Sequence, residues 1–198
     1  MGHTRRDRIL GLAGGSGMRV LDVGCGNGAL GAVIRGRGNW VGGVELSEQA
    51  LAVARGRLDE LWSFDIESVW PQRLTDGPFD LVILSEVLEH VFDPIAVLRS
   101  VRNVLQPRGA IIITTPNFMT WTNRVRFLFG DFRYRDQGMF DFGHIRWFTY
   151  RYLRSVLSEA GFRMTDERHI IFPGKLTRFL KYWPSLFAWQ FIIRAQPL

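Results

Sequence analysis

Cysteine and lysine are almost absent from this chain of 198 residues. The single cysteine, Cys25, excludes a disulfide within the chain and favours a reducing compartment. Lys175 and Lys181 are the only lysines, so arginine carries nearly all of the positive charge behind the formal net charge of +6. A basic balance is compatible with nucleic acid, anionic lipid, phosphorylated substrates or only a solvated basic surface, and it selects none of them.

Long apolar segments are also missing. No run of about 18 uncharged apolar residues occurs, so we expect no membrane-spanning helix. Residues 1–17 include basic residues but no apolar stretch of the length that a signal peptide needs. We therefore expect a cytoplasmic protein and leave contact with a membrane surface open. The length and the 46% hydrophobic content fit one domain over residues 1–198.

Short apolar runs alternate with helical patterns along the first 117 residues. Strands are expected at residues 18–24, 39–46, 61–68, 78–86 and 109–117. Helices are expected between them at residues 29–38, 47–60 and 93–109, with Ser47 and Asp93 as N-caps. This alternation predicts βαβ units and a parallel sheet with helices on both faces. A helix capped by Thr149 and two further strands are expected at residues 149–161, 162–172 and 186–195.

The alternation stops after Asn117. Residues 118–143 are too long for a simple connection and are rich in aromatic residues and arginine. Such residues beside a site can stack on bases and pair with phosphates, form an amphipathic lid for an apolar chain, or simply cover the domain. These interpretations stay open, and we expect the insertion to cover the substrate.

Glycines are concentrated after the first expected strand, in VLDVGCGNGALG (20–31). Glycine lets a backbone approach a ligand closely, and the helix that follows offers free N–H groups. Gly24, Gly26 and Ala29 match the dinucleotide pattern G-x-G-x-x-G/A, and Glu45 has about the spacing of its ribose-binding acid. Alone, this match does not distinguish a dinucleotide from another ligand.

Asp22 distinguishes this loop from the glycine loop of nicotinamide enzymes. A carboxylate that points into the loop repels a pyrophosphate but helps to hold a cationic or amine-bearing ligand. The order D-x-G-x-G-x-G, from Asp22 to Gly28, resembles the first motif of class I S-adenosylmethionine-dependent methyltransferases, of the type 11/23 kind. The resemblance covers nearly the whole chain. It implies an α/β, Rossmann-like fold with a seven-stranded, mostly parallel sheet and an antiparallel last strand.

The same resemblance implies a site for S-adenosyl-L-methionine. Glu45 would receive both ribose hydroxyls, which suits a carboxylate with two acceptor oxygens. Asp65 would accept a hydrogen bond from the adenine amine, with Ile66 beside the ring. Without the resemblance, these acids read as ordinary residues of a strand end and a loop. The implied cofactor-binding residues are Asp22, Gly24, Cys25, Gly26, Gly28, Glu45, Leu46, Asp65, Ile66, Ser85 and Glu86.

A second polar group follows the fourth expected strand, in SEVLEHV. If residues 86–90 form a helical turn, Glu86, Glu89 and His90 share one face. His144, in DFGHIRWFT, precedes a later helix. The set is similar to the pattern of small-RNA 3′-terminal 2′-O-methyltransferases, in which E-x-x-E-H and a later histidine bind a divalent cation.

Three interpretations of this group stay open. A Mg²⁺ or Mn²⁺ ion held by Glu86, Glu89, His90 and His144 would lower the pKa of an acceptor hydroxyl. Without a metal, His90, His144 and Glu89 are the catalytic candidates, with a histidine as the base. The same side chains also fit a structural contact near the methionine end of the cofactor.

The function that these motifs imply is methyl transfer to an oxygen of a small-molecule, sugar or lipid-linked acceptor. The SEVLEHV stretch is similar to the ubiquinone-pathway O-methyltransferases. TTPNF and GHIRWFT resemble in part the MetW proteins of methionine biosynthesis, so an accessory protein that acts with a partner enzyme is the alternative. RNA 2′-O-methylation is a further alternative, but we expect no nucleic-acid substrate because no appended RNA-binding segment is evident. The sequence does not indicate the oligomeric state.

Overall fold

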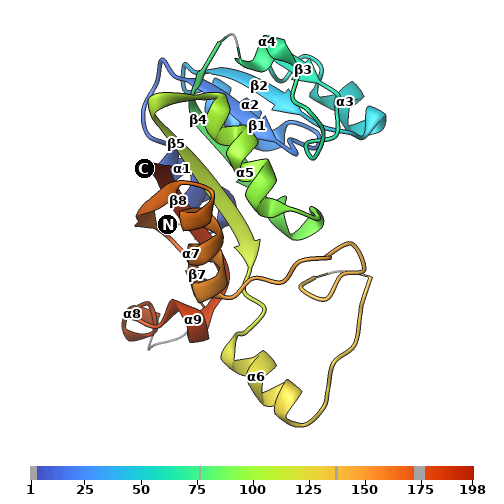
Figure 1. Ribbon diagram of the computed structural model, residues 1–198, viewed down its shortest axis with the longest axis vertical. Helices are drawn as coiled ribbons and strands as arrows, with labels where there is room; N and C mark the ends of the chain where they lie inside the picture. Colours follow the sequence, from blue (N-terminus) through green and yellow to red (C-terminus); the bar gives the residue numbers. More distant parts are fainter. Residues whose placement is uncertain (1–3, 76, 137, 172–176) are drawn as a thin grey trace.

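The computed structural model describes residues 4–75, 77–136, 138–171 and 177–198 (Figure 1). Its strands are β1 Arg19–Val23, β2 Trp40–Val44, β3 Glu60–Trp62, β4 Phe79–Ser85, β5 Leu105–Pro116, β6 Phe162–Glu167, β7 Ile170–Ile171 and β8 Ala188–Pro197. Its helices are α1 Arg5–Ala13, α2 Ala29–Arg35, α3 Glu48–Ala54, α4 Gln72–Thr75, α5 Pro94–Asn103, α6 Trp121–Leu128, α7 Tyr150–Glu159, α8 Thr177–Leu180, α9 Pro184–Phe187 and the 3₁₀ turn η1 Leu88–His90.

The strands form one sheet in the order β3-β2-β1-β4-β5-β8-β6, with the two-residue β7 paired to β8. Strands β1 to β5 are parallel, whereas β8 pairs antiparallel with β5 and β6. The predicted mostly parallel sheet with an antiparallel last strand is confirmed. The strand expected at 162–172 is divided into β6 and β7, and its last residue lies outside the described residues.

Side chains of the central strands pack into two separate hydrophobic cores. On β4, Leu81 and Ile83 pack in the cluster that contains buried residues of α1 and α2, whereas Val82 and Leu84 pack in the cluster that contains those of α5 and α7. This alternation follows from the two-residue period of a strand. Figure 1 shows α5 and α7 side by side in front of the sheet. Both faces are therefore covered, and the loops at the carboxyl edge are left for a site.

Helix starts agree with the sequence better than helix ends do. Ser47, Asp93 and Thr149 each accept hydrogen bonds from first-turn backbone N–H groups, as N-caps do. The helix expected at 93–109 ends earlier, because β5 begins at Leu105 and pairs with Phe79. The sequence did not predict α1, which begins at a capping box of Thr4 and packs against β5 and β8.

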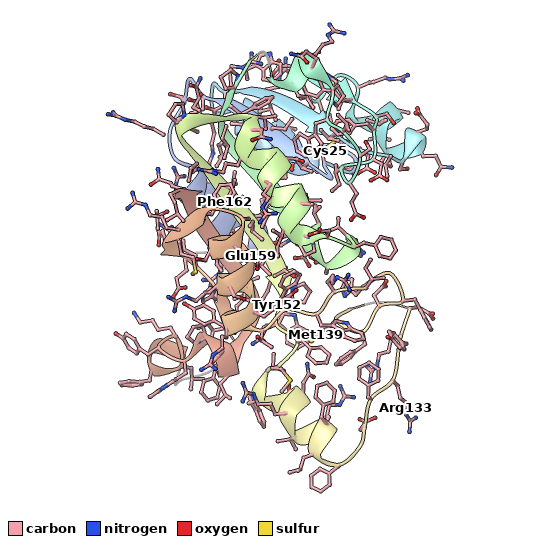
Figure 2. The ribbon with its side chains drawn as sticks, in the orientation of Figure 1. Cys25, Arg133, Met139, Tyr152, Glu159 and Phe162 are labelled. Atoms are coloured by element: carbon pink, nitrogen blue, oxygen red, sulfur yellow. The ribbon has the colours of Figure 1, made fainter. Side chains whose placement is uncertain are left out.

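Residues 118–143 form an arm that projects from the carboxyl edge of the sheet (Figure 1). Its inner side is a cluster of rings with centroids 5.1 to 5.9 Å apart: Phe118, Phe127, Phe132, Phe140 and Trp147. Figure 2 shows Arg133 pointing away from the body and Met139 lying where the arm returns to it. No helix in the described part of the chain has the length and apolarity for a bilayer crossing.

Asn117 fixes the base of the arm, and its replacement tests this description. The fully buried side chain donates to the Ala188 carbonyl at 2.8 Å and accepts from the Met119 N–H at 3.0 Å. Asn117→Ala leaves the buried Ala188 carbonyl and the half-buried Met119 N–H without this partner, so we expect the free energy of unfolding to fall by about 2 kcal/mol in urea titrations. Asn103→Ala, at an exposed position, is the control. Equal losses in the two variants would contradict the assigned role.

Candidate functional site

The glycine-rich loop lies at the carboxyl end of β1 and needs glycine for its shape. Gly24, Gly26 and Gly28 have φ angles of 69°, 54° and 75°. A Cβ on Gly24 would lie 2.8 Å from the Val87 side chain, whereas a Cβ on Gly26 would meet open space. The loop therefore turns in the left-handed region and leaves its backbone at Gly26 open to a ligand.

Glu45, at the end of β2, is held against this loop. Its Oε2 atom accepts the Gly26 N–H at 2.9 Å, and its Oε1 atom accepts the Leu46 and Ser47 N–H groups at 2.9 and 3.0 Å. Three backbone donors thus orient the carboxylate, and Oε2 keeps a lone pair for a ligand hydroxyl. The predicted ribose acid and the glycine loop are brought together by the parallel pairing of β1 and β2.

Asp22 lies at the base of the loop, beside α2. It is buried, its Oδ2 atom has no hydrogen-bond partner of standard geometry among the described residues, and a Cβ on Gly31 of α2 would lie 3.5 Å from that atom. Burial, followed by the charge of Glu45, raises the pKa of Asp22 to about 7, and the Gly31 backbone N–H offsets part of this rise. The side chain therefore lies against α2 beneath the loop, and its role toward the cofactor stays a prediction.

Cys25 is a buried residue of the loop, and its thiol donates to the Gly26 carbonyl at 3.6 Å (Figure 2). Its Sγ atom packs toward β2, where a Cβ on Gly43 would come within 2.7 Å of it. Burial and the charges of Asp22 and Glu45 raise the pKa of the thiol to about 12, so the thiol is not a nucleophile.

The other implied cofactor residues lie along the same edge. Leu46 and Asp65 are exposed in the loops after β2 and β3, and Asp65 accepts the Glu67 N–H at 2.9 Å. Ile66 packs partly against the core, which leaves the rest of its side chain for a flat ring. The Ser85 hydroxyl lies 3.2 Å from that of Thr114. The expected third strand of 61–68 is only β3, so Asp65 and Ile66 belong to a loop.

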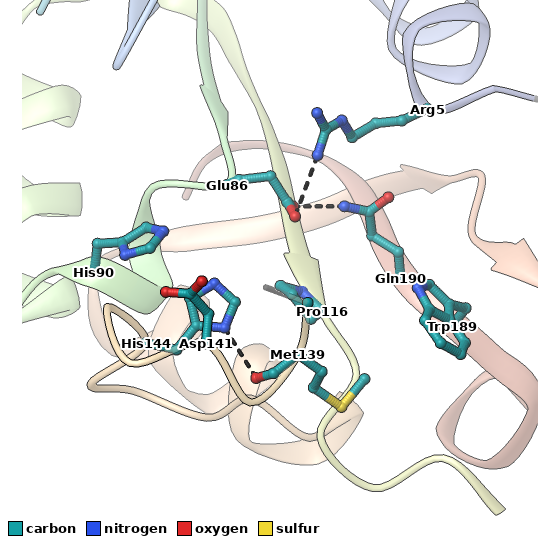
Figure 3. Close-up of a pocket in the computed structure, with 10 residues that line it drawn as sticks. Arg5, Glu86, His90, Pro116, Met139, Asp141, His144, Trp189 and Gln190 are labelled. Atoms are coloured by element: carbon teal, nitrogen blue, oxygen red, sulfur yellow. Dashed lines mark hydrogen bonds and ion pairs between the residues drawn. The ribbon is translucent and has the colours of Figure 1, made fainter. Parts of the chain in front are cut away.

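Glu86 stands apart from the other members of the second polar group. The helical turn begins only at Leu88, and Glu86 has a φ of 60°. Its carboxylate accepts the Thr114 hydroxyl at 2.8 Å and the Gln190 amide at 2.5 Å, and pairs with Arg5 at 3.2 Å (Figure 3). Three elements, α1, β5 and β8, therefore converge on this side chain.

Glu89, His90 and His144 do come together. One potential ligand atom from each lies within 4.8 Å of the others. His90 Nδ1 donates to the Gly143 carbonyl and His144 Nδ1 to the Met139 carbonyl, each at 2.9 Å. Because a carbonyl only accepts, the Nε2 atom of each neutral ring keeps its lone pair. Histidines held in this way serve as metal ligands or as bases.

Glu89 is the buried member of this trio. Burial, followed by the charge of Glu86, raises its pKa to about 8, and the Thr115 hydroxyl and Arg5 offset part of the rise. Within the described part of the chain, no hydrogen bond of standard geometry reaches either carboxylate oxygen. One carboxylate and two imidazoles form a donor set that fits a divalent transition metal.

A cleft of about 380 Å³ adjoins the two histidines (Figure 3). Of its lining residues, sequence reasoning named only Glu86, His90 and His144, and the polar or aromatic residues that it missed include Arg5, Asp141, Trp189 and Gln190. No motif marks them, because they come from α1, the arm and β8, which meet only in the fold. The alternation of the last strand predicted a strand there, but not that its first residues would face a cleft.

Comparisons with known proteins agree with this arrangement. A family model described as a methyltransferase domain matches residues 3–167. The ubiquinone biosynthesis O-methyltransferase of Pseudomonas aeruginosa (strain LESB58) is 37% identical over 109 residues, covering 53% of this chain and 47% of that protein. That of Thiobacillus denitrificans is 42% identical over 106 residues, covering 52% and 46%. The chain spans about half the length of these curated relatives.

Solved structures show the fold. A SAM-dependent methyltransferase from Methanosarcina mazei is similar with a TM-score of 0.67 at 20% identity, covering 96% of this chain and 97% of that chain. Magnesium protoporphyrin IX methyltransferase from Synechocystis PCC 6803, with bound SAH, has a TM-score of 0.65 at 16% identity, covering 96% and 78%. The chain therefore has the Rossmann-like fold of these enzymes.

The raised pKa of Asp22 predicts an unusual pH dependence of stability. Because the folded state holds this proton more tightly than the unfolded state, the carboxyl destabilises the fold increasingly as pH rises from about 4 to about 7. Asp22→Asn cannot ionise and still offers an oxygen to Gly31. We expect its Tm to exceed the parent Tm at about pH 8, with the difference shrinking toward about pH 5.

Differential scanning fluorimetry across this range measures the effect. Glu48→Gln, at an exposed position in the first turn of α3, is the control and should lack the trend. A Tm difference for Asp22→Asn that does not grow with pH would refute the buried, proton-binding role.

Proposed function

Because this chain belongs to the methyltransferase domain family, we propose that it transfers a methyl group from S-adenosyl-L-methionine to an oxygen atom of a small acceptor. The observation that carries the proposal is the carboxylate of Glu45 fixed on the open backbone of Gly26. This pairing offers a backbone cradle and an acceptor for hydroxyls at one edge of the sheet. The relatives that are named O-methyltransferases support oxygen as the methyl acceptor.

The cofactor supplies a methyl group already activated on a sulfonium. The glycine loop would pass along its amino-acid part, Glu45 would hold the ribose, and Asp65 with Ile66 would hold the adenine. The remaining work of the protein is to orient the acceptor and to remove a proton from its hydroxyl. His90 and His144 present their Nε2 lone pairs at the cleft, so one of them serves as the general base.

A divalent cation at Glu89, His90 and His144 is the finer form of this proposal. When bound, it would lower the pKa of the acceptor hydroxyl. Two imidazoles in the donor set favour Mn²⁺ over Mg²⁺. Glu86, included among the ligands from the sequence, is instead engaged with Arg5 and Gln190, so we propose a three-residue site without it.

The arm supports peripheral contact with an anionic membrane. Leu128 and Phe129, at the end of α6, are 80% and 81% exposed, and Trp121 and Val125 are half exposed on the same side of the helix. Arg133, on the same arm, is exposed and shares Asp131 as an ion-pair partner with Arg126, so two arginines face one acid there. Apolar residues with neighbouring arginine are typical of helices that lie on lipid surfaces. Such contact would suit a lipid-linked acceptor, and we propose it as the partner surface.

Cofactor binding is the first test of this function. Isothermal titration calorimetry with S-adenosyl-L-methionine should show binding to the parent chain. Glu45→Gln keeps the shape but gives up charge and an acceptor oxygen for the ribose, so we expect affinity to fall about tenfold or more. Glu48→Gln, three residues further on, is the matched control and should bind as the parent does. An absence of binding to the parent would overturn the enzymatic proposal in favour of an accessory protein.

Metal binding is the second test. Calorimetry with Mn²⁺ should show one site in the parent chain, lost in Glu89→Gln and His144→Ala and retained in Glu86→Gln. The reason is that only the first two remove ligands of the trio. Chelator should likewise stop methyl transfer, and Mn²⁺ should restore it. Activity that survives chelation would leave metal-free catalysis by a histidine base and refute the cation site.

A further inference from the structure

We infer that the acceptor is a hydroxyl-rich ring, of the chemical class of a pyranose, bound in the cleft between α1, β8 and the arm (Figure 3). This inference rests on the proposed function, since it takes the cleft beside His90 and His144 as the place where the acceptor hydroxyl lies. The inferred acceptor differs from a prenylated ring, which is the kind of acceptor that the relatives' name, ubiquinone biosynthesis O-methyltransferase, suggests.

The chemistry of the cleft wall is the first observation. Six of the ten lining residues carry side chains that form strong hydrogen bonds: Arg5, Glu86, His90, Asp141, His144 and Gln190. Among the described residues that line it, only Pro116, Met139 and Trp189 have apolar side chains. A prenyl chain requires a continuous apolar channel, because polar groups that it covers lose their hydrogen bonds to water. This wall suits a ligand that is polar around its rim.

Trp189 supplies the apolar face that a sugar ring needs. Its side chain is 50% exposed at the start of β8 and lines the cleft. Its carbonyl accepts the Asn117 N–H at 3.0 Å, and the neighbouring Gln190 pairs with Pro116 of β5, so the backbone beneath the indole is fixed. A pyranose has one face of C–H groups, which packs well on a rigid aromatic plane while its hydroxyls stay at the rim.

Gln190 supplies the oriented polar group. It is only 7% exposed, and its amide nitrogen donates to Glu86, which also pairs with Arg5 and Thr114. This network fixes planar side chains before any ligand arrives. The second amide proton and the carbonyl oxygen of Gln190, and the remaining guanidinium protons of Arg5, are donors and acceptors for neighbouring hydroxyls.

The two ends of the cleft have different roles in this proposal, one in binding and the other in proton removal. Figure 3 shows Arg5, Glu86 and Gln190 converging at one end and His90 and His144 facing the cleft from the other. A ring resting on Trp189 would present one hydroxyl to the histidines and its neighbours to the polar network. A hydroxyl is methylated in this arrangement by loss of its proton to the base and gain of the methyl group, while the cofactor leaves as the neutral thioether.

A direct comparison of acceptors tests the inference. The parent chain is incubated with radiolabelled S-adenosyl-L-methionine and either a panel of nucleoside-diphosphate hexoses and methyl pyranosides, or a catechol that carries one prenyl unit. We expect label in at least one pyranose and a higher kcat/KM for it than for the catechol. Nucleotide sugars and simple glycosides in separate arms show whether the diphosphate is needed. Label in the catechol alone, or in none of these probes, overturns the inference.

Variants of Trp189 connect the result to the cleft. Trp189→Ala should raise KM for the labelled pyranose about tenfold with kcat changed less, because it removes stacking and leaves the base in place. Trp189→Phe should restore most of the affinity. Trp183→Ala is the matched control, since that tryptophan is 60% exposed but lies before α9 and outside the cleft lining. An unchanged KM in Trp189→Ala, or an equal change in Trp183→Ala, refutes the stacking role.

Saturation-transfer NMR gives a readout that does not need turnover. With S-adenosyl-L-homocysteine present, the ring protons of the pyranose should receive saturation from the parent chain and from Trp183→Ala, but not from Trp189→Ala. Failure of cofactor binding in calorimetry would overturn the proposed function. Cofactor binding with no saturation of any pyranose would overturn only the inference that the acceptor is a pyranose.

Discussion

Parallel pairing of β1 between β2 and β4 is the constraint on which the site depends. Residues 20–23 pair with β2 on one side and with β4 on the other, so three carboxyl ends reach the same edge together. The glycine loop, Glu45 and the Glu86 turn each follow one of these ends. If β2 and β4 ran antiparallel to β1, the loops that follow them would lie at the opposite edge of the sheet from the glycine loop. Buried apolar faces on both sides hold this register, because a slip by one residue would exchange the two cores.

The strained backbone of Glu86 lies between two groups of polar side chains. Glu86 is the only described non-glycine residue with positive φ, and this conformation costs on the order of 1 kcal/mol. Contacts from Arg5, Thr114 and Gln190 offset that cost. The turn directs Glu86 toward α1 and β8, and the next helical turn directs Glu89 and His90 toward His144. One short segment therefore contributes both to a polar network and to the cluster of Glu89, His90 and His144.

The sequence predicted the elements that local signals specify. Apolar runs gave the strands, Ser47, Asp93 and Thr149 gave the helix starts, and alternating glycines gave the first loop. It did not predict α1 or the side-chain directions of Asp22 and Glu86. A helix of mixed polarity is stabilised mainly by packing on β5 and β8, which no local pattern reveals. The direction of a carboxylate depends on the groups around it. Gln190 is distant in the sequence from Glu86, and Gly31 approaches Asp22 only through the geometry of the turn between them.

Removing Glu86 from the candidate ligands changes the chemistry of the trio. Two carboxylates would neutralise the charge of a divalent cation in the proposed site and supply oxygen ligands. With Glu89 as the single carboxylate, a bound cation would leave the site a net positive charge and two nitrogen donors. A net positive site stabilises an alkoxide more strongly, which favours proton loss from an alcohol hydroxyl of high pKa. Sugar hydroxyls need that help more than phenols do. The placement of Glu86 thus agrees with the polar cleft: the same contacts that free the trio from a second carboxylate build the network beside it.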